Sequence, residues 1–312
     1  MSIQPSSRDP WGDFWASKEG ALGGGCLPAR WVGIDTNQRA TWQGFARLLP
    51  KGARVIDLAT GDGRVMGWLL GARRDLKCLG VDLAPTLPAP PKGSRSRGGT
   101  AMEALPVGDS SQDAVTSQFG FEYGDVRAIL SEVARVLKPG GQAALMTHRL
   151  DGSILEHNLP RRQGLLWVLD ECKLIDKARG SVALRAVVPG VAPAIRTAPE
   201  QAKRLFGPGS AGWELAEAIV QTLALGFNDH PHNVRGLLDT LEAKARNEIG
   251  RIESLGAACH SVADEAALTC RISDAGLTVA SHRILKESGS ARPFAGWWVL
   301  RHSPAASRTS AS

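Results

Sequence analysis

A short segment of the sequence combines a carboxylate with closely spaced glycines. The run VIDLATGDGR places Asp57 at the end of a β-branched apolar stretch and puts Gly61 and Gly63 in the turn that follows. Glycine lets a backbone turn tightly and approach a bound molecule, because no Cβ stands between them. The apolar run VMGWLLGA, which has helical character, comes next. We predict a strand, a glycine-containing turn and a helix, with a nucleotide or nucleoside lying across the turn.

A second carboxylate stands at a spacing that suits a ribose. Asp82 ends the apolar run KCLGVD, 19 residues after Gly63, where a carboxylate can accept hydrogen bonds from both hydroxyls of an adenosine ribose. The structural alternative is that Asp82 only caps the following turn. A nicotinamide dinucleotide is disfavoured, because its GxGxxG pattern needs a glycine where Met66 stands, and Gly67 comes one residue later.

The elements that must position these residues alternate along the chain. Strand-like runs are predicted at 54–58, 77–82, 113–119 and 142–148, with helical patterns between most of them. Such alternation predicts βαβ units and a mostly parallel sheet that binds ligands beyond the carboxyl ends of its strands. The Pro-rich segment 83–99 cannot form the usual crossover helix, so we expect a loop in its place.

The rest of the chain divides into further segments. A helix near the N-terminus is expected, with Thr36 as its cap, and a later helix is expected to end at Gly276 before two strands that form an antiparallel hairpin. The segment PGVAPAIRTAP is expected to interrupt the helices of a cap. The predicted parts are a flap and helix (1–50), a core (51–150), an inserted helical cap (151–263), the end of the core (264–302) and a disordered tail (303–312).

The composition argues against a disordered or fibrous protein. With 43% hydrophobic and 22% charged residues in 312, the chain resembles an ordinary globular protein. No apolar window approaches 18 residues and the start lacks the layout of a signal peptide, so we predict a cytoplasmic protein. The five cysteines never form CxxC, and the histidines at 230, 232 and 260 lack further ligands at suitable spacing, so no metal site is predicted.

Four segments in a fixed order resemble the class I S-adenosylmethionine-dependent methyltransferase superfamily: VIDLATGDG, GVD, AMEALPVGDSSQDAVTSQFGF and EVARVLKPGG. They are most similar to the branch that contains the ubiquinone and menaquinone biosynthesis C-methyltransferases. The resemblance covers about residues 45–148 and, faintly, 264–302. It implies S-adenosylmethionine as the cofactor. It also implies an α/β fold with a Rossmann-like, mostly parallel seven-stranded sheet, a C-terminal antiparallel hairpin and the inserted helical cap.

The resemblance also implies which residues hold the cofactor. The turn would pack on the methionine part, Asp82 would hold the ribose, and Met102 and Glu103 would border the adenine. Ala101 departs from the family, because many members place an Asp or Asn there to bind the adenine amino group. That contact would come from the backbone or from Glu103. The implied cofactor-binding residues are Asp57, Ala59, Thr60, Gly61, Gly63, Asp82, Leu83, Met102, Glu103, Gln118 and Phe119.

The sequence says less about the methyl acceptor than about the cofactor. Methyl transfer needs alignment of the reactants more than a covalent nucleophile. If the acceptor is a phenol, an activated carbon or an amide nitrogen, a base must remove a proton, and the candidates by location are His148 first, then Tyr123 and Glu122. Each of these three residues could equally have a structural role alone, without taking part in catalysis. Aromatic residues of the cap would favour a small hydrophobic or aromatic acceptor. These aromatic residues are Trp167, Phe206, Trp213 and Phe227.

Two other classes of function stay open at this point. Basic residues near the expected cofactor site and in the cap would suit an RNA or protein methyltransferase. A non-catalytic binder of S-adenosylmethionine is the third alternative, since Ala101 and the missing crossover helix weaken the adenine side. A homodimer is left open, with no interface identified, and no membrane insertion is expected. The basic residues are Lys92, Arg95, Arg97, Arg161 and Arg162.

Overall fold

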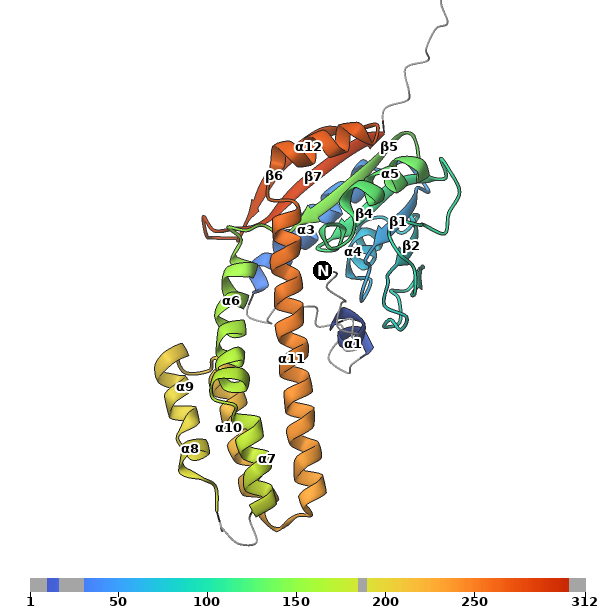
Figure 1. The fold of residues 1–312 in the computed structure, drawn as a ribbon. Coiled ribbons are helices and arrows are strands. Elements are labelled where there is room, and N and C mark those ends of the chain that lie inside the picture. The colour runs from blue at the N-terminus through green and yellow to red at the C-terminus, as the bar shows by residue number, and fades with distance from the viewer. Residues whose placement is uncertain (1–9, 17–30, 185–189, 303–312) are drawn as a thin grey trace, which may run out of the picture. The chain divides into compact units, whose positions relative to one another are not determined.

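The chain divides into two compact units. The computed structural model describes residues 10–16, 31–184 and 190–302, so the predictions made for the first nine residues, for 17–30 and for the tail lie outside it. The first unit comprises Met1–Ser153 with Ser254–Ser312, and the second is Ile154–Glu253 (Figure 1). The second unit falls within the segment 151–263 that we expected to be an inserted cap.

The first unit is built on a seven-stranded sheet. Its order is β3-β2-β1-β4-β5-β7-β6, in which β5 pairs with β7, and β7 with β6, in antiparallel fashion while the other neighbours are parallel. This confirms the predicted α/β fold with its terminal hairpin. The strands are β1 (Arg54–Leu58), β2 (Lys77–Val81), β3 (Ser94–Arg97), β4 (Gln112–Gln118), β5 (Leu137–Thr147), β6 (Leu277–Lys286) and β7 (Pro293–His302).

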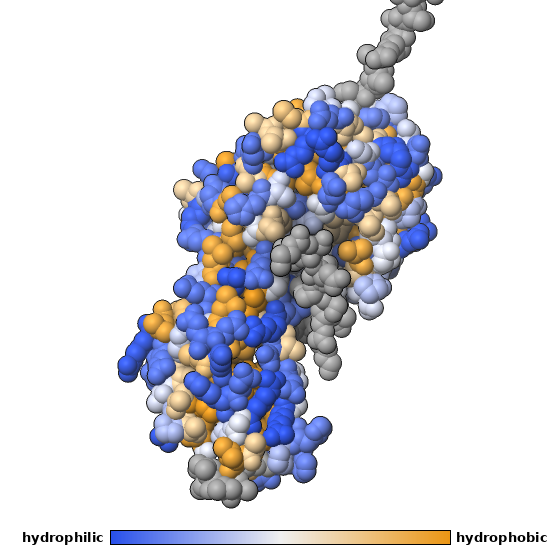
Figure 2. Space-filling model, viewed as in Figure 1, coloured by the Kyte–Doolittle hydropathy of each residue, from blue (hydrophilic) through white to orange (hydrophobic). Residues whose placement is uncertain are grey.

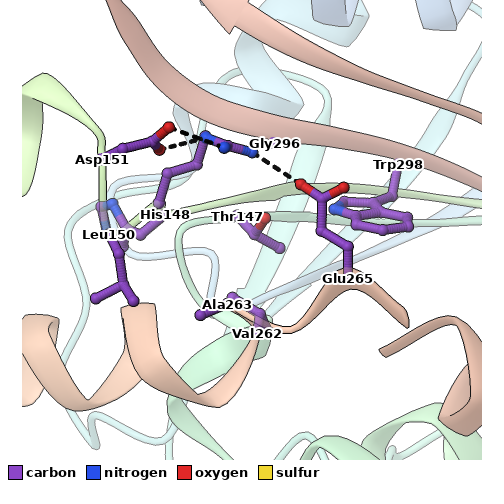
Figure 3. A pocket seen from close by; sticks show the side chains of 10 residues that line it. Thr147, His148, Leu150, Asp151, Val262, Ala263, Glu265, Gly296 and Trp298 are labelled. Carbon is purple, nitrogen blue, oxygen red and sulfur yellow. Dashed lines mark hydrogen bonds and ion pairs between the residues drawn. The ribbon is translucent and has the colours of Figure 1, made fainter. Parts of the chain in front are cut away.

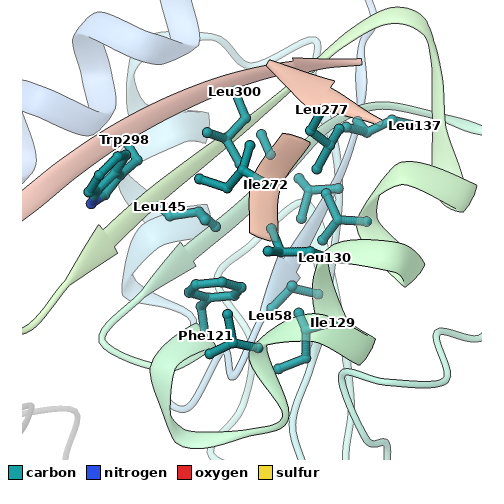
Figure 4. Packing of buried hydrophobic residues seen from close by; sticks show 14 of the residues in the cluster. Leu58, Phe121, Ile129, Leu130, Leu137, Leu145, Ile272, Leu277, Trp298 and Leu300 are labelled. Atoms are coloured by element: carbon teal, nitrogen blue, oxygen red, sulfur yellow. The ribbon is translucent and has the colours of Figure 1, made fainter. Parts of the chain in front are cut away.

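Helices cover both faces of the sheet. Successive side chains of a strand point to opposite faces, and β7 shows this with two neighbouring tryptophans. Trp297 meets Trp42 edge to face at 4.8 Å, whereas Trp298 belongs to a large core that includes residues of α5 and α12 (Figure 4). Trp42 lies on α3, so α3 and the pair α5 and α12 cover opposite faces. The helices of this unit include α1 (Pro10–Ala16), α3 (Val32–Leu48), α4 (Arg64–Ala72), α5 (Val126–Val136) and α12 (Glu265–Asp274).

Three local predictions need correction. The Pro-rich segment forms no helix, as expected, but it contains β3, which pairs in parallel with β2. Arg95 and Arg97 are exposed on this edge strand, where charge discourages pairing with another chain. Thr36 does not cap its helix, because α3 begins at Val32, and the strand expected at 142–148 begins five residues earlier, since β5 starts at Leu137. Gly276 follows α12 with a φ of 78°, the left-handed conformation expected of a helix-ending glycine.

The second unit is helical. The segment expected to interrupt its helices is not helical at 190–192, but it then holds the short helix α8 and the start of α9. Pro193 and Pro199 stand in the first turn of these helices, where proline is tolerated. The elements are α6 (Ser153–Leu166), a π-helical turn (Trp167–Glu171), α7 (Leu174–Leu184), α8 (Pro193–Arg196), α9 (Ala198–Phe206), α10 (Ala211–Leu225), η3 (Gly226–Asn228) and α11 (Pro231–Ser261), of which α6 and α11 also connect to the first unit.

Three of the four aromatic residues expected in the cap pack on the core of the helical unit, and Phe227 is exposed. Trp167 and Phe206 lie 5.9 Å apart, edge to face, and both pack with Trp213 on the buried residues of this unit. Other apolar side chains are exposed, and Figure 2 shows orange residues among blue ones on this part of the surface. An apolar pocket lined by the cap therefore stays a prediction. The largest exposed apolar side chains here are Leu159, Leu184, Leu205, Leu225, Phe227 and Leu237.

Candidate functional site

The carboxyl ends of three parallel strands lie level with one another. Leu58, the last residue of β1, pairs with Val81 of β2 on one side and with Ser117 of β4 on the other. The loops that leave these strands therefore meet at one edge of the sheet. In parallel α/β sheets this edge is where ligands bind.

The glycine turn is locked to the sheet by a buried carboxylate. Asp57 accepts hydrogen bonds from Thr60 Oγ1 at 2.7 Å and from Thr116 Oγ1 at 2.6 Å. Burial raises the pKa of Asp57 to about 7, although the two threonine hydroxyls oppose this shift. Gly61 and Gly63 adopt φ values of 52° and 74°, which glycine accepts without strain. Asp57 thus shapes the turn from beneath.

Asp82 stands beside the turn and is fixed by backbone amides. Its Oδ2 accepts from Gly61 N at 2.9 Å and its Oδ1 from Ala84 N at 3.0 Å. A carboxylate can accept more than two hydrogen bonds, so these amides orient the group without exhausting it. Leu83, the next residue, exposes 65% of its surface at the same edge. The pair offers a charged acceptor and an apolar face side by side.

Close packing joins the loops after β1 and β4. A Cβ on Gly120 would stand 2.3 Å from the Cβ of Ala59, which no real structure tolerates. Both Ala59 and Phe119 adopt positive φ, at 50° and 56°. The sequence alone offers no signal for this contact, because nothing in it shows that the two loops approach each other.

Met102 and Glu103 lie against the loop that precedes α5. Glu103 Oε1 accepts a hydrogen bond from Asp125 N at 3.0 Å. A Cβ on Gly124 would come within 2.5 Å of this oxygen and within 3.3 Å of the Met102 side chain. The carboxylate of Glu103 therefore has a structural partner in addition to the adenine role expected for it.

Gln118 was expected to face the methionine part of the cofactor, and the structure turns its side chain elsewhere. Its Oε1 accepts from Trp42 Nε1 at 2.6 Å and its Nε2 donates to Gln38 Oε1 at 3.4 Å. Both partners belong to α3, so the amide of Gln118 ties that helix to the end of β4. Phe119, by contrast, remains partly exposed at the edge.

The three catalytic candidates lie together at the ends of β4 and β5. The His148 ring stacks on Phe119 at 4.1 Å and meets Tyr123 edge to face at 6.0 Å. Glu122 lies beneath, 2% exposed, and its Oε1 accepts from the backbone N of His148 at 2.7 Å. The backbone oxygen of Glu122 accepts from Ser261 Oγ at 2.8 Å. The sequence brought these residues to one region, and the structure places them in contact.

Burial determines the protonation states of His148 and Glu122. It lowers the pKa of His148 to about 3, so the imidazole is neutral near pH 7. It raises the pKa of Glu122 to about 7, although the amide of His148 opposes this. No group among the residues that the structure describes hydrogen-bonds Oε2 of Glu122 or Nδ1 of His148, and both atoms are buried. Buried polar atoms without a hydrogen-bond partner are rare because they are costly, and a catalytic or binding role is one explanation for them.

A cavity of about 130 Å³ opens beside His148 (Figure 3). Arg149 Nε binds Asp151 Oδ1 at 2.7 Å and Arg149 Nη1 binds Glu265 Oε1 at 3.0 Å at its rim. Trp298 and Val262 contribute apolar surface. The cavity extends from the end of β5 to the start of α12, so it belongs to the same edge of the sheet. Its lining residues are Thr147, His148, Arg149, Leu150, Asp151, Val262, Ala263, Glu265, Gly296 and Trp298.

The remaining expectations concern basic residues of the cap, metal sites and membrane-spanning helices. Arg161 pairs with Glu248 at 2.8 Å and Arg162 with Glu253 at 2.5 Å, so both arginines are engaged within the helical unit. Across the described ranges, no three His, Cys, Asp or Glu side chains are grouped so that they could hold a metal ion. Within the same ranges, no helix has both the length and the apolar character needed to cross a membrane.

Comparison with protein families identifies the domain that contains β1 through β5. The model described as a methyltransferase domain matches residues 56–145, from β1 through β5. This segment is a methyltransferase domain of the class I S-adenosylmethionine-dependent superfamily. The match includes the Asp57 turn, Asp82 and the end of β4, so the residues that carried the resemblance are those that the fold assembles at one edge.

Curated relatives share the methyltransferase domain and little beyond it. A malonyl-[acyl-carrier protein] O-methyltransferase of Methylococcus capsulatus is 36% identical over 112 residues, which are 33% of this chain and 40% of the relative. A demethylmenaquinone methyltransferase of Thermus thermophilus is 34% identical over 101 residues, 30% of this chain and 46% of the relative. The chain thus spans less than half the length of these two relatives.

Among solved structures, geranyl diphosphate C-methyltransferase from Streptomyces coelicolor is similar with a TM-score of 0.35 and 17% identity, covering 46% of this chain and 67% of that one.

Proposed function

We propose that this chain transfers the methyl group of S-adenosylmethionine to a small apolar or aromatic molecule. The observation that carries the proposal is Asp82, fixed by Gly61 N and Ala84 N at the end of β2 in a methyltransferase domain. A carboxylate in this place binds ribose hydroxyls in nucleotide-binding folds. Hydrogen bonds to a charged group contribute about 1.5 to 3 kcal/mol each. When bound, the cofactor supplies a methyl group activated on a sulfonium.

The remaining residues of the edge fit a nucleoside with an attached amino-acid part. The methionine end would lie along the turn, beside Ala59 and Thr60. Trp15 of α1 packs on the bare backbone of Gly61, and Pro91 fills the space beside Gly63. Exposed Leu83 suits one face of the adenine, with Met102 and Glu103 at its border. Phe119 lies between the turn and His148, where the methyl group would point. Asp57 and Gln118 act from behind, by shaping the turn and holding α3.

The acid and base roles differ from those that location alone suggested. With a pKa of about 3, His148 is too weak a base to remove a phenolic proton, so we assign it to contact and orient the acceptor. Glu122 is sealed beneath His148 and binds its backbone, so we assign it as a positioning residue. Tyr123 flanks the histidine. This arrangement favours an acceptor that ionises on its own near neutral pH, such as an acidic phenol or an enol.

These assignments predict separate effects on binding and transfer. His148→Ala and Tyr123→Phe are expected to slow methyl transfer and to leave the affinity for S-adenosylhomocysteine within about twofold. Acceptors named for the relatives, demethylmenaquinone and malonyl-[acyl-carrier protein], are the first to screen. Unchanged transfer rates in both variants would remove these side chains from the acceptor site.

Calorimetric titration with S-adenosylmethionine, S-adenosylhomocysteine and NAD tests the proposed cofactor before any acceptor is known. We expect saturable binding of the two adenosyl ligands and none of NAD, because the turn lacks the third glycine of the dinucleotide pattern. Binding of NAD alone, or of none of the three, would contradict the proposal. Binding of the cofactor without transfer to any acceptor would favour the non-catalytic alternative.

The paired arginines of the helical unit give no support to an RNA substrate. A homodimer and a cytoplasmic location stay predictions.

A further inference from the structure

The short helix α1 carries three aromatic side chains on one face. Trp11, Phe14 and Trp15 stand at positions i, i+3 and i+4 of the helix Pro10–Ala16, a spacing that brings side chains together on one side. Trp11 and Phe14 meet edge to face at 5.9 Å, and Phe14 and Trp15 do so at 5.0 Å. A helix of seven residues is too short to be stable alone, so contacts with the rest of the unit hold it in place.

These contacts reach both parts of the functional site. A Cβ on Gly61 would come within 2.4 Å of Trp15 Cζ2, so the indole of Trp15 rests directly on the glycine turn. At the other end, Trp11 meets Tyr123 edge to face at 5.7 Å, and Tyr123 meets His148 at 6.0 Å. A row of aromatic rings therefore runs from the cofactor turn to the catalytic candidates at the end of β5.

The rings of this row are only partly buried. Trp11, Phe14, Trp15 and Tyr123 each keep part of their surface exposed. Aromatic side chains left partly exposed at a ligand-binding edge offer flat apolar faces, which is how small-molecule sites usually hold planar ligands. Their placement beside His148 puts those faces where an acceptor must lie for its reacting atom to meet the methyl group.

We propose that α1 is the wall of the acceptor site. The exposed faces of Trp11 and Phe14 hold a planar apolar part of the acceptor alongside Tyr123 and His148, while Trp15, resting on Gly61, links this wall to the bound cofactor. The inference rests on the proposed function and names the acceptor class, planar and apolar, with the residues that select it. Because one helix contacts both ligands, each ligand should strengthen the binding of the other by the same factor.

Binding of 2-naphthol, a planar apolar phenol, to the full chain tests the inference. We expect saturable binding by calorimetry that is severalfold tighter with saturating S-adenosylhomocysteine than without it. Trp11→Ala should weaken naphthol binding by about tenfold, because an aromatic contact face is lost, and should leave S-adenosylhomocysteine affinity within about twofold. Trp11→Phe should restore most of the naphthol affinity. Trp15→Ala should weaken S-adenosylhomocysteine binding and remove the coupling between the two ligands.

Trp68→Ala is the matched control, since this partly exposed tryptophan lies on α4, 5.8 Å from the Arg64 guanidinium, and belongs neither to the aromatic row nor to the cap. It should change neither affinity. The inference is overturned if naphthol does not bind the loaded wild-type chain, or binds Trp11→Ala equally well, while S-adenosylhomocysteine binds normally. A wild-type chain that fails to bind S-adenosylhomocysteine overturns the proposed function, and this inference with it. Cyclohexanol, which lacks a planar ring, should bind much more weakly than naphthol; equal affinities would contradict the planar acceptor class.

Discussion

Asp82→Ala is expected to weaken the binding of S-adenosylhomocysteine by about 100-fold. The variant removes the carboxylate proposed to accept hydrogen bonds from two ribose hydroxyls, a loss of about 3 kcal/mol in total. About 1.4 kcal/mol corresponds to a tenfold change in affinity. It also releases the amides of Gly61 and Ala84, which the carboxylate holds at 2.9 and 3.0 Å, so the turn itself becomes less ordered. Calorimetry with the purified variant measures the loss.

Two variants separate the charge from its position. Asp82→Asn keeps one acceptor oxygen, so we expect an affinity between those of the wild type and Asp82→Ala. Asp109→Ala removes an exposed aspartate of the same unit that pairs with Arg135, and it should leave the affinity unchanged. An Asp82→Ala chain that binds S-adenosylhomocysteine as tightly as the wild type would show that the ribose lies elsewhere.

Glu122→Gln is expected to stabilise the chain at pH 8 relative to the wild type while leaving the two proteins equally stable near pH 4. The substitution keeps the size of the side chain and an oxygen that can accept from His148 N. Burial raises the pKa of Glu122 from 4.5 to about 7, so the folded wild type binds this proton more tightly than the unfolded chain. Its contribution to stability is present below pH 4.5 and is lost as the pH rises through 7.

The size of the effect follows from the same shift. A rise from 4.5 to about 7 corresponds to about 3 kcal/mol between pH 4 and pH 8, and this part should be absent in the glutamine variant. Urea unfolding of both proteins across this pH range measures the difference in the free energy of unfolding. The comparison isolates Glu122, because His148 and Asp57 titrate in both proteins. A difference that does not change with pH would mean that Glu122 is solvated or paired in the folded chain.

Much of the fold was predictable from local pattern. The run RVIDL is short, apolar and β-branched, and it forms β1 over the residues expected. The two last strands follow Gly276 and form the expected antiparallel hairpin. The strand SRSR was missed, because Ser94–Arg97 has no apolar alternation and exists as a strand only by pairing with β2. Edge strands of this kind carry little local signal, since their backbone partner supplies the order.

The candidate site also combines residues that the sequence predicts with contacts that only the folded chain makes. The sequence predicted that Asp57, the glycine turn and Asp82 lie together, because their spacing along a strand, turn and helix is short, and the structure joins them at one edge. That they bind the cofactor stays a proposal. The redirection of Gln118 to Trp42 was not, since the two residues lie 76 positions apart and meet only through the packing of α3 on the sheet. The order of the catalytic candidates also changed. Location favoured His148, whereas its burial, a property of the folded chain, lowers its pKa to about 3.

The sequence by itself determined the chemistry at the cofactor edge. Positive φ at Gly61 and Gly63 and a carboxylate after the second strand follow from residue type and short spacing, which the chain carries before it folds. Only the tertiary structure decided which aromatic side chains lie beside the glycine turn and the catalytic candidates. It brought Trp15 onto Gly61 and Trp11 beside Tyr123, over separations of 46 and 112 residues in the sequence. Contacts at such distances depend on the packing of whole elements, and no local pattern of residues encodes them.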